Sequence, residues 1–215
     1  WEIEEKSADQ LELSAGFGGG IGLTGTLGIT FSNFSLKNIR KKSTWDPLPS
    51  GDGQRLSARI QSNGKAFRSY NFSFTEPWLG GTQRNSFSIS YFNTKFSNSI
   101  SPYGDYCRAC GDTSYLKTVG FGISLGKQLK WPDDYFSTYI ELGYKYYDVV
   151  NDTRFPVFSK GIANDISLQY TIQRSSVSAP TYPQSGSNFT FLSKATLPYS
   201  SIIGKDYSLL SPQER

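Results

Sequence analysis

Leu23-Thr24-Gly25-Thr26-Leu27-Gly28-Ile29-Thr30-Phe31-Ser32 is the stretch that decides the fold, because its residues alternate with a period of two. Odd positions are mostly large and apolar, and even positions are Thr, Gly or Ser. The chain carries no charge between Glu12 and Lys37, a run long enough for a transmembrane helix. The period of two, the glycines and the β-branched residues instead favour a strand with one lipid-facing side and one water-facing side.

The same alternation recurs along the chain and predicts nine antiparallel strands. Apolar side chains occupy every second position of each run, as Val119, Phe121 and Ile123 do. Small or polar residues fill most opposite positions, together with charged residues such as Arg59 and Glu141. Most runs approach the about 9 to 11 residues that a tilted strand needs to cross a bilayer. The predicted strands are Leu11–Phe17, Gly22–Ser32, Gln54–Ser62, Ser69–Thr75, Asn85–Phe96, Tyr115–Leu125, Phe136–Asp148, Asp165–Arg174 and Asn188–Leu197.

Aromatic side chains favour a membrane barrel over a soluble sandwich. A sandwich would show the same alternation, so alternation alone does not choose between the two. Six aromatic residues fall at predicted strand ends or in the adjoining turns, where an interfacial girdle would place them. These are Trp78, Tyr103, Tyr106, Trp131, Tyr135 and Tyr182. Nine strands is an odd number, whereas bacterial single-chain barrels are even-numbered, so we expect these strands to be part of a larger barrel.

The composition agrees with a β-protein and bounds its function. Of 215 residues, 15% are aromatic and 19% are charged, and Gly numbers 21, a balance that favours strands and turns. The net charge of +4 comes from scattered Lys and Arg residues, unlike the clustered basic face of a nucleic-acid-binding protein. The chain opens on Trp1 without a leader-like segment and contains no Met, so we expect further domains upstream.

No combination of residues predicts catalysis, a metal site or a cofactor site. The chain has no His, which rules out a Ser-His-Asp triad, and Asp133-Asp134 lie together in a turn rather than converging from different elements. Cys107 and Cys110 form a CxxC in a polar loop and supply too few ligands for a zinc site. We interpret them as a loop disulfide in an oxidising compartment. Gly20–Gly25 matches GxGxxG, but strand alternation follows it instead of a helix.

The connection Asn33–Gly53 is unusual in length and charge. It contains Pro, Gly and the basic run Arg40-Lys41-Lys42. A solvated turn is the simplest interpretation of this run, and contact with acidic lipid headgroups or with a partner protein is the alternative.

Four segments together resemble the BamA family of outer-membrane assembly factors. Trp1–Lys6 resembles the last strand of the periplasmic POTRA domain that precedes the barrel, with Ser7–Gln10 as a hinge. Leu11–Ser32 resembles the first hairpin of the barrel. The other two segments resemble periplasmic turns of the family: Glu76, Pro77 and Trp78 at the end of Ser73–Leu79, and Tyr182, Pro183 and Gly186 within Tyr182–Ser187. The long Asn33–Gly53 connection departs from the tight turn that is usual there.

The resemblance implies an organisation, a location and a function. Residues 1–10 would be the end of the last POTRA domain and its hinge, and residues 11–215 the N-terminal half of a 16-stranded antiparallel transmembrane barrel. The protein would lie in the outer membrane of a Gram-negative bacterium and insert client β-barrel proteins there, without nucleotide, cofactor or covalent chemistry. Its implied partners are outer-membrane lipid, client barrels and accessory lipoproteins on the periplasmic side, and no nucleic acid.

The first predicted strand is the candidate site under this resemblance. An unpaired strand edge offers N–H and C=O groups that another strand can complete. Our hypothesis is that the barrel opens beside this strand and that the terminal strand of a client adds to it. The residues involved are Leu11, Glu12, Leu13, Ser14, Ala15, Gly16 and Phe17, followed by Gly18, Gly19 and Gly20 as a flexible break. The residues alone would equally allow these glycines to be no more than an outer loop.

Three other functions fit the sequence less well. Within the same superfamily, the chain could belong to a barrel that translocates a dedicated passenger. It could also be a passive porin or structural barrel, which would need no POTRA strand at Trp1–Lys6. A soluble adhesin fits least, because it gives no reason for aromatic residues at the strand ends.

Overall fold

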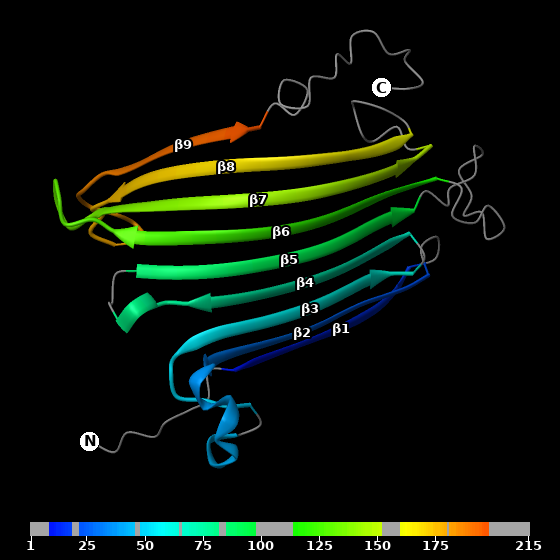
Figure 1. The fold of residues 1–215 in the computed structure, drawn as a ribbon, viewed down its shortest axis with the longest axis horizontal. Coiled ribbons are helices and arrows are strands. Elements are labelled where there is room, and N and C mark those ends of the chain that lie inside the picture. Colours follow the sequence, from blue (N-terminus) through cyan, green and yellow to red (C-terminus); the bar gives the residue numbers. More distant parts are fainter. Residues whose placement is uncertain are drawn as a thin grey trace, which may run out of the picture.

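The computed structural model describes residues 9–18, 22–45, 48–64, 66–81, 85–97, 114–151, 160–179 and 181–197. Nine strands in these ranges form one open antiparallel sheet whose order follows the chain (Figure 1). The strands are β1 (Gln10–Gly18), β2 (Gly22–Phe34), β3 (Gln54–Asn63), β4 (Phe67–Glu76), β5 (Asn85–Ser97), β6 (Tyr115–Gln128), β7 (Phe136–Val150), β8 (Gly161–Ser175) and β9 (Asn188–Thr196). The nine predicted strands and the all-β class are therefore confirmed.

Each strand pairs with the next one along the chain, so the connections between strands alternate between the two ends of the sheet. We number each connection by the strand before it: the even-numbered connections, after β2, β4, β6 and β8, lie at one end, and the odd-numbered connections lie at the other. The connection after β2 contains the 3-10 turns η1 (Lys37–Arg40) and η2 (Lys42–Thr44), and the connection after β4 contains η3 (Leu79–Gly81). Among the described residues, no helix has the length and apolarity needed to span a membrane.

The strand register gathers the apolar side chains on one face. Leu13 lies opposite Leu27, which lies opposite Ile60, which in turn lies opposite Tyr70. Similar rows continue across β4 to β8, and their large apolar side chains remain broadly exposed. A sheet that leaves an entire apolar face uncovered is stable only if something apolar, such as lipid, covers that face.

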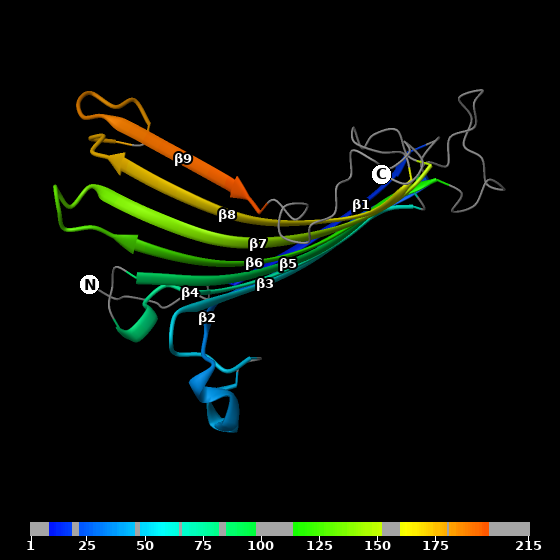
Figure 2. The same ribbon diagram turned by 45° about the horizontal axis from the view of Figure 1, so that its top comes forward.

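The opposite face of the sheet carries mostly polar and small side chains. Thr26, Ser69 and Ser167 on this face are buried although they are polar. Gly120 lies directly opposite Phe92, whose ring occupies the place where a side chain at Gly120 would be. Gly126 lies opposite Tyr139 in the same way, and a Cβ there would approach the tyrosine Cε1 to 2.6 Å. These contacts allow the sheet to curve, as Figure 2 shows.

Several predicted features lie outside the described residues. They are Trp1–Lys6, Gly19, Gly20, Tyr103, Tyr106, Cys107 and Cys110. The POTRA strand and the loop disulfide thus remain predictions.

Candidate functional site: the edge of the first strand

All seven residues predicted for the client seam lie in β1, and Gly18 is the last residue of that strand. Among the described strands, β1 pairs only with β2, so its other edge carries N–H and C=O groups with no strand beside them. The apolar side chains of β1 are the more exposed for this reason. Leu13 and Phe17 are 77% and 81% exposed, compared with 43% for Leu27 on the neighbouring strand.

Few side chains hold β1 against β2. Of the nine cross-strand pairs between them, four contain a glycine: Glu12–Gly28, Ala15–Gly25, Gly16–Thr24 and Gly18–Gly22. Because pairs of side chains supply much of the stabilisation between strands, β1 relies mainly on its backbone hydrogen bonds.

One ion pair ties β1 to the sheet across β2. The Glu12 Oε1 atom lies 2.9 Å from Nη2 of Arg59, and Gly28 of β2 lies between them in the same row. A Cβ at Gly28 would lie 3.2 Å from Glu12 Oε2 and 3.7 Å from the Arg59 Cγ atom, so the glycine leaves the path between the two charges clear. We call Glu12, Gly28 and Arg59 the β1 latch. Both charged side chains are about half exposed, which limits the contribution of the pair to about 0.2–1 kcal/mol.

Two hydrogen bonds hold β1 near its ends. The Ser32 amide donates to Asp9 Oδ1 at 2.9 Å, and the Thr24 hydroxyl donates to the Gly16 carbonyl at 3.2 Å. The β1 latch therefore lies between two hydrogen bonds that already hold the chain near β1 against β2.

The Glu76-Pro77-Trp78 motif forms the turn between β4 and β5. Glu76 accepts a hydrogen bond from the Trp78 amide at 3.1 Å and another from the Gln54 side chain at 2.6 Å. The carboxylate thus joins its own turn to the start of β3. Trp78 is exposed at the end of the sheet.

The motif containing Tyr182, Pro183 and Gly186 forms the connection between β8 and β9. Gly186 has a φ of 101°, and a Cβ there would overlap the carbonyl group of Ser176. Only glycine fits this position without a backbone change. The Ser178 hydroxyl accepts from the Gln184 amide at 3.1 Å and closes the turn.

Arg174, at the end of β8, joins two connections at the same end of the sheet. Its guanidinium donates to Asp133 Oδ2 through Nε at 3.0 Å and lies 2.9 Å from it through Nη2. Nη1 donates to the Ser187 hydroxyl at 2.6 Å and to the Ser176 hydroxyl at 2.9 Å. The β6–β7 and β8–β9 connections are thus fixed to each other.

Aromatic residues mark this end of the sheet. Trp78, Trp131, Tyr135 and Tyr182 all lie in or beside even-numbered connections and are exposed. Trp45, in the β2–β3 connection, joins them. The prediction of aromatic residues at strand ends is confirmed for those that the structure describes.

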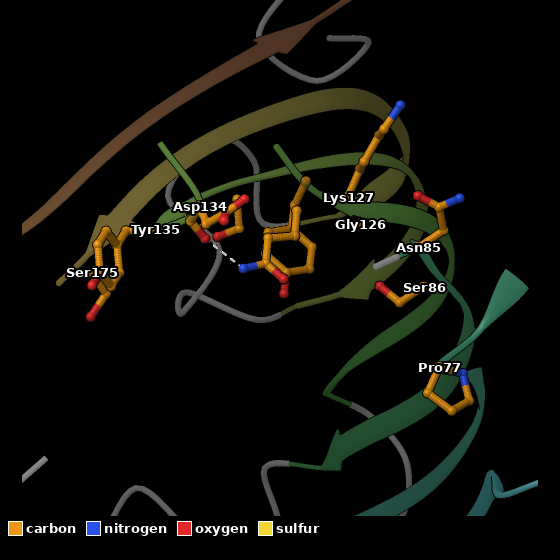
Figure 3. Close-up of a pocket in the computed structure, with 11 residues that line it drawn as sticks. Pro77, Asn85, Ser86, Gly126, Lys127, Asp134, Tyr135 and Ser175 are labelled. Carbon is orange, nitrogen blue, oxygen red and sulfur yellow. Dashed lines mark hydrogen bonds between the residues drawn. The ribbon is translucent and has the colours of Figure 1, made fainter. Parts of the chain in front are cut away.

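A hollow of about 350 Å³ lies at this end, between the β4–β5 and β6–β7 connections and the adjoining strands (Figure 3). Gly126, Ser86 and Tyr139 form part of its wall, and the Gln128 amide donates to the Asp134 carbonyl across it at 2.5 Å. Lys127 extends away from Asp134 in Figure 3. The lining is polar and holds no nucleophile–base pair. Among the described residues, no three His, Cys, Asp or Glu side chains are grouped to bind a metal.

The basic run of the long connection lies in and beside the turns η1 and η2. Arg40, Lys41 and Lys42 are exposed, and Leu36 and Ile39 next to them are exposed apolar residues. Ser35 anchors the connection, since its hydroxyl donates to Asp52 Oδ2 at 2.6 Å and its amide donates to the Pro49 carbonyl at 2.8 Å.

An open antiparallel sheet with one apolar and one polar face, bounded by aromatic residues, defines part of an outer-membrane-type β-barrel. The Omp85 superfamily domain matches residues 50–208, and the chain belongs to this superfamily. A comparison with curated protein sequences found no match.

The fold is similar to that of the crystal structure of BamA from Haemophilus ducreyi lacking POTRA domains 1–3. The TM-score is 0.54 and the sequence identity 23%, over 91% of this chain. The match covers 35% of the BamA chain, so this chain spans about a third of that protein. The sequence prediction of a BamA-type barrel segment is confirmed at the level of fold and superfamily.

Sequence reasoning missed the pairing of Glu12 with Arg59 and the role of Arg174. Both arginines stand at positions that the alternation assigns to strands, but their partners are distant in the chain. The signal for the β1 latch was available in principle, because aligning three strands in register places Glu12, Gly28 and Arg59 in one row.

Proposed function

We propose that this chain is part of an assembly factor that inserts β-barrel proteins into the bacterial outer membrane, and that β1 receives the terminal strand of each client. The observation that carries the proposal is the small number of side-chain contacts that hold β1 against β2, because glycine occupies four of the nine cross-strand pairs. Superfamily membership and the BamA-like fold support the membrane location and the role in insertion. We also propose that residues 1–10 end a POTRA domain and that residues 11–215 begin the barrel.

The physical basis is the cost of an open strand edge in lipid. Each unsatisfied backbone group in the bilayer costs several kcal/mol, so an exposed β1 edge would bind a free strand strongly. A client strand meets the same cost before it is paired. Pairing with β1 removes both costs at once and needs no nucleotide, cofactor or covalent step. The apolar face of the sheet contacts outer-membrane lipid, and the even-numbered connections face the periplasm, where accessory lipoproteins would bind.

The experiment is a cysteine cross-link in cells that express the full-length protein. Leu13→Cys or Ala15→Cys on β1 is combined with cysteines along the last strand of a client barrel. A disulfide between the two during assembly is the expected result. The matched control is Ile123→Cys in the centre of β6, which also faces outward but already has strands on both sides.

The outcomes separate the proposal from its alternatives. If the client still inserts while neither β1 cysteine forms a cross-link, the templating role is wrong. A passive porin would also give no cross-link, and it would show a wide ion conductance in planar bilayers. A barrel that translocates a passenger would cross-link inside its lumen, at residues of the polar face, instead of at the β1 edge.

A further inference from the structure

The connection between β2 and β3 turns toward the apolar side of the sheet. The Phe34 ring, at the end of β2, packs edge-on against Phe74 of the apolar face, with 6.4 Å between the ring centres. Gln54, at the start of β3, occupies the same alternate positions as Leu56 on that face, and its side-chain oxygen accepts a hydrogen bond from the Leu36 amide at 2.8 Å. In Figure 2 the turns η1 and η2 lie on the convex side of the curved sheet. The connection therefore begins on the side of the sheet that lipid would cover.

Residues Leu36–Trp45, which we call the basic turn, present an apolar ridge beside a basic ridge. A 3-10 helix has three residues per turn, so side chains three positions apart line up along it. Leu36 and Ile39 form one ridge of η1 and are 49% and 44% exposed. Lys37 and Arg40 form the next ridge and are also exposed. Apolar and cationic side chains are thus available together at the surface.

The third ridge of η1 fastens the basic turn to the rest of the connection. Asn38 donates from its side chain to the Ser50 carbonyl at 2.9 Å and from its amide to the Ser35 hydroxyl at 3.1 Å. Further along, the Asn33 side chain accepts a hydrogen bond from the Gly53 amide at 3.0 Å. Because these contacts already order the backbone, binding through the two exposed ridges would cost little further conformational entropy.

The basic turn is cationic and ends in a tryptophan. Residues 35–53 contain two acidic residues, and their four basic residues are Lys37, Arg40, Lys41 and Lys42. The carboxylate of one of the acidic residues, Asp52, already accepts a hydrogen bond from the Ser35 hydroxyl at 2.6 Å. Trp45, directly after η2, is 45% exposed. An exposed segment that combines Lys and Arg with Trp and large aliphatic residues has the composition of segments that lie in a membrane interface.

Position distinguishes lipid from a periplasmic protein as the binding partner of the basic turn. The turn lies on the apolar side of the sheet, at the end where Trp78, Trp131 and Tyr135 are exposed. Such aromatic residues mark the level of the lipid headgroups around a barrel. A surface at this level on the apolar side faces the bilayer, whereas a periplasmic protein would approach the end of the sheet from water. Anionic headgroups also attract nearby Lys and Arg side chains.

We propose that the basic turn is a membrane anchor that binds anionic phospholipid. Leu36, Ile39 and Trp45 enter the headgroup region, and the basic side chains bind the phosphodiester groups of negatively charged lipids. The assignment to the periplasmic leaflet rests on the proposed function, which places the even-numbered connections in the periplasm. Because the basic turn follows β2, which pairs with β1, this contact sets the depth of both strands in the membrane.

The first test measures lipid binding by the full-length protein in detergent, with native mass spectrometry as the readout. The probes are phosphatidylglycerol, phosphatidylcholine and inorganic phosphate. The test variant, Lys37→Gln with Arg40→Gln, removes the basic ridge. Its matched control, Arg55→Gln with Lys194→Gln, also removes one arginine and one lysine, but from the polar face. We expect the wild-type protein and the control to retain phosphatidylglycerol and the test variant to bind it about tenfold more weakly, with phosphatidylcholine binding equal in all three.

The second test measures whether Trp45 reaches the lipid. The full-length protein is reconstituted in vesicles of phosphatidylcholine and phosphatidylglycerol whose acyl chains carry bromine, which quenches nearby tryptophan fluorescence. Trp45→Phe isolates the contribution of Trp45 by difference, and vesicles without bromine supply the reference. We expect the Trp45 contribution to be quenched in the wild-type protein and less quenched in the variant that lacks the basic ridge.

Three results would overturn the proposal. The first is a test variant that retains phosphatidylglycerol as well as the wild-type protein does. The second is displacement of the lipid by inorganic phosphate, which would indicate a site for free anions. The third is Trp45 emission that brominated lipid does not quench, which would place the basic turn in water, where a periplasmic protein could bind it.

The leaflet and the proposed function are tested separately. Neither lipid assay involves a client, so its outcome is independent of the β1 cross-link. Asn63 ends β3 at the opposite end of the sheet from the basic turn. Labelling of Asn63→Cys on intact cells is the expected result, and its absence would contradict the periplasmic leaflet.

Discussion

Breaking the β1 latch is expected to loosen β1 without disturbing the rest of the sheet. Glu12→Gln or Arg59→Gln removes an ion pair whose charged atoms lie 2.9 Å apart and whose side chains are about half exposed. Such a pair contributes about 0.2–1 kcal/mol. If β1 opens locally, this loss increases the open population by about 1.4-fold to 5-fold. Amides of Gln10–Gly18 should then exchange faster with solvent by the same factor.

Hydrogen exchange with mass spectrometry on the full-length protein in lipid nanodiscs measures this factor. Peptides from β6 and β7 serve as the internal reference, because the latch does not touch them. The charge-reversed double variant Glu12→Arg with Arg59→Glu restores the attraction across Gly28 and should return the exchange of β1 toward the wild-type rate. The reasoning is refuted if the single variants leave β1 exchange unchanged, or if the double variant exchanges as fast as the two single losses combined.

Three further changes test the curvature of the sheet and its turns. Gly120→Val would place a side chain where the Phe92 ring lies and should cost about 1–3 kcal/mol, seen as a lower midpoint in urea unfolding from detergent. Gly186→Ala meets a φ of 101° and should lower the same midpoint. Arg174→Lys cannot reproduce the forked contacts with Asp133 and the serine hydroxyls, and should make the β8–β9 connection more sensitive to limited proteolysis.

Each of these changes has a control variant. Phe92→Ala combined with Gly120→Val should recover part of the lost stability, and no recovery would contradict the proposed ring contact. Ser185→Ala changes the same turn as Gly186→Ala without a positive φ, so an equal loss in both would argue against backbone strain. Lys194→Gln removes a basic residue from β9 that makes none of these contacts, and equal protease sensitivity in this variant would argue against a role for the forked contacts of Arg174.

The sheet was predictable from the sequence because the alternation of apolar and polar residues, with a period of two, indicates both which segments are strands and which face of the sheet each side chain occupies. Strand ends were less predictable, since β6 continues through Lys127 to Gln128 and β8 already begins at Gly161, where the apolar pattern has faded. Phe92 shows another limit. Both Tyr91 and Phe92 are aromatic, and only the register with Gly120 explains why one of them belongs on the polar face.

The candidate site was predictable as a strand but not as a set of contacts. The glycines that weaken the β1–β2 pairing are visible in the sequence, and their effect follows once the register is known. The β1 latch and the contacts of Arg174 join residues that are 47 and 41 positions apart. Such pairings depend on the alignment of several strands and on turn geometry, which residue patterns alone do not determine.

The register of the cross-link between β1 and a client tests the central proposal most directly. In antiparallel pairing, moving a cysteine two residues forward on β1, from Leu13 to Ala15, must move its best partner two residues backward on the client's last strand. Disulfide yields across a matrix of such pairs, measured during assembly in cells, should therefore fall on one antiparallel diagonal. Yields spread evenly over the matrix, or confined to one β1 position, would contradict templating by β1.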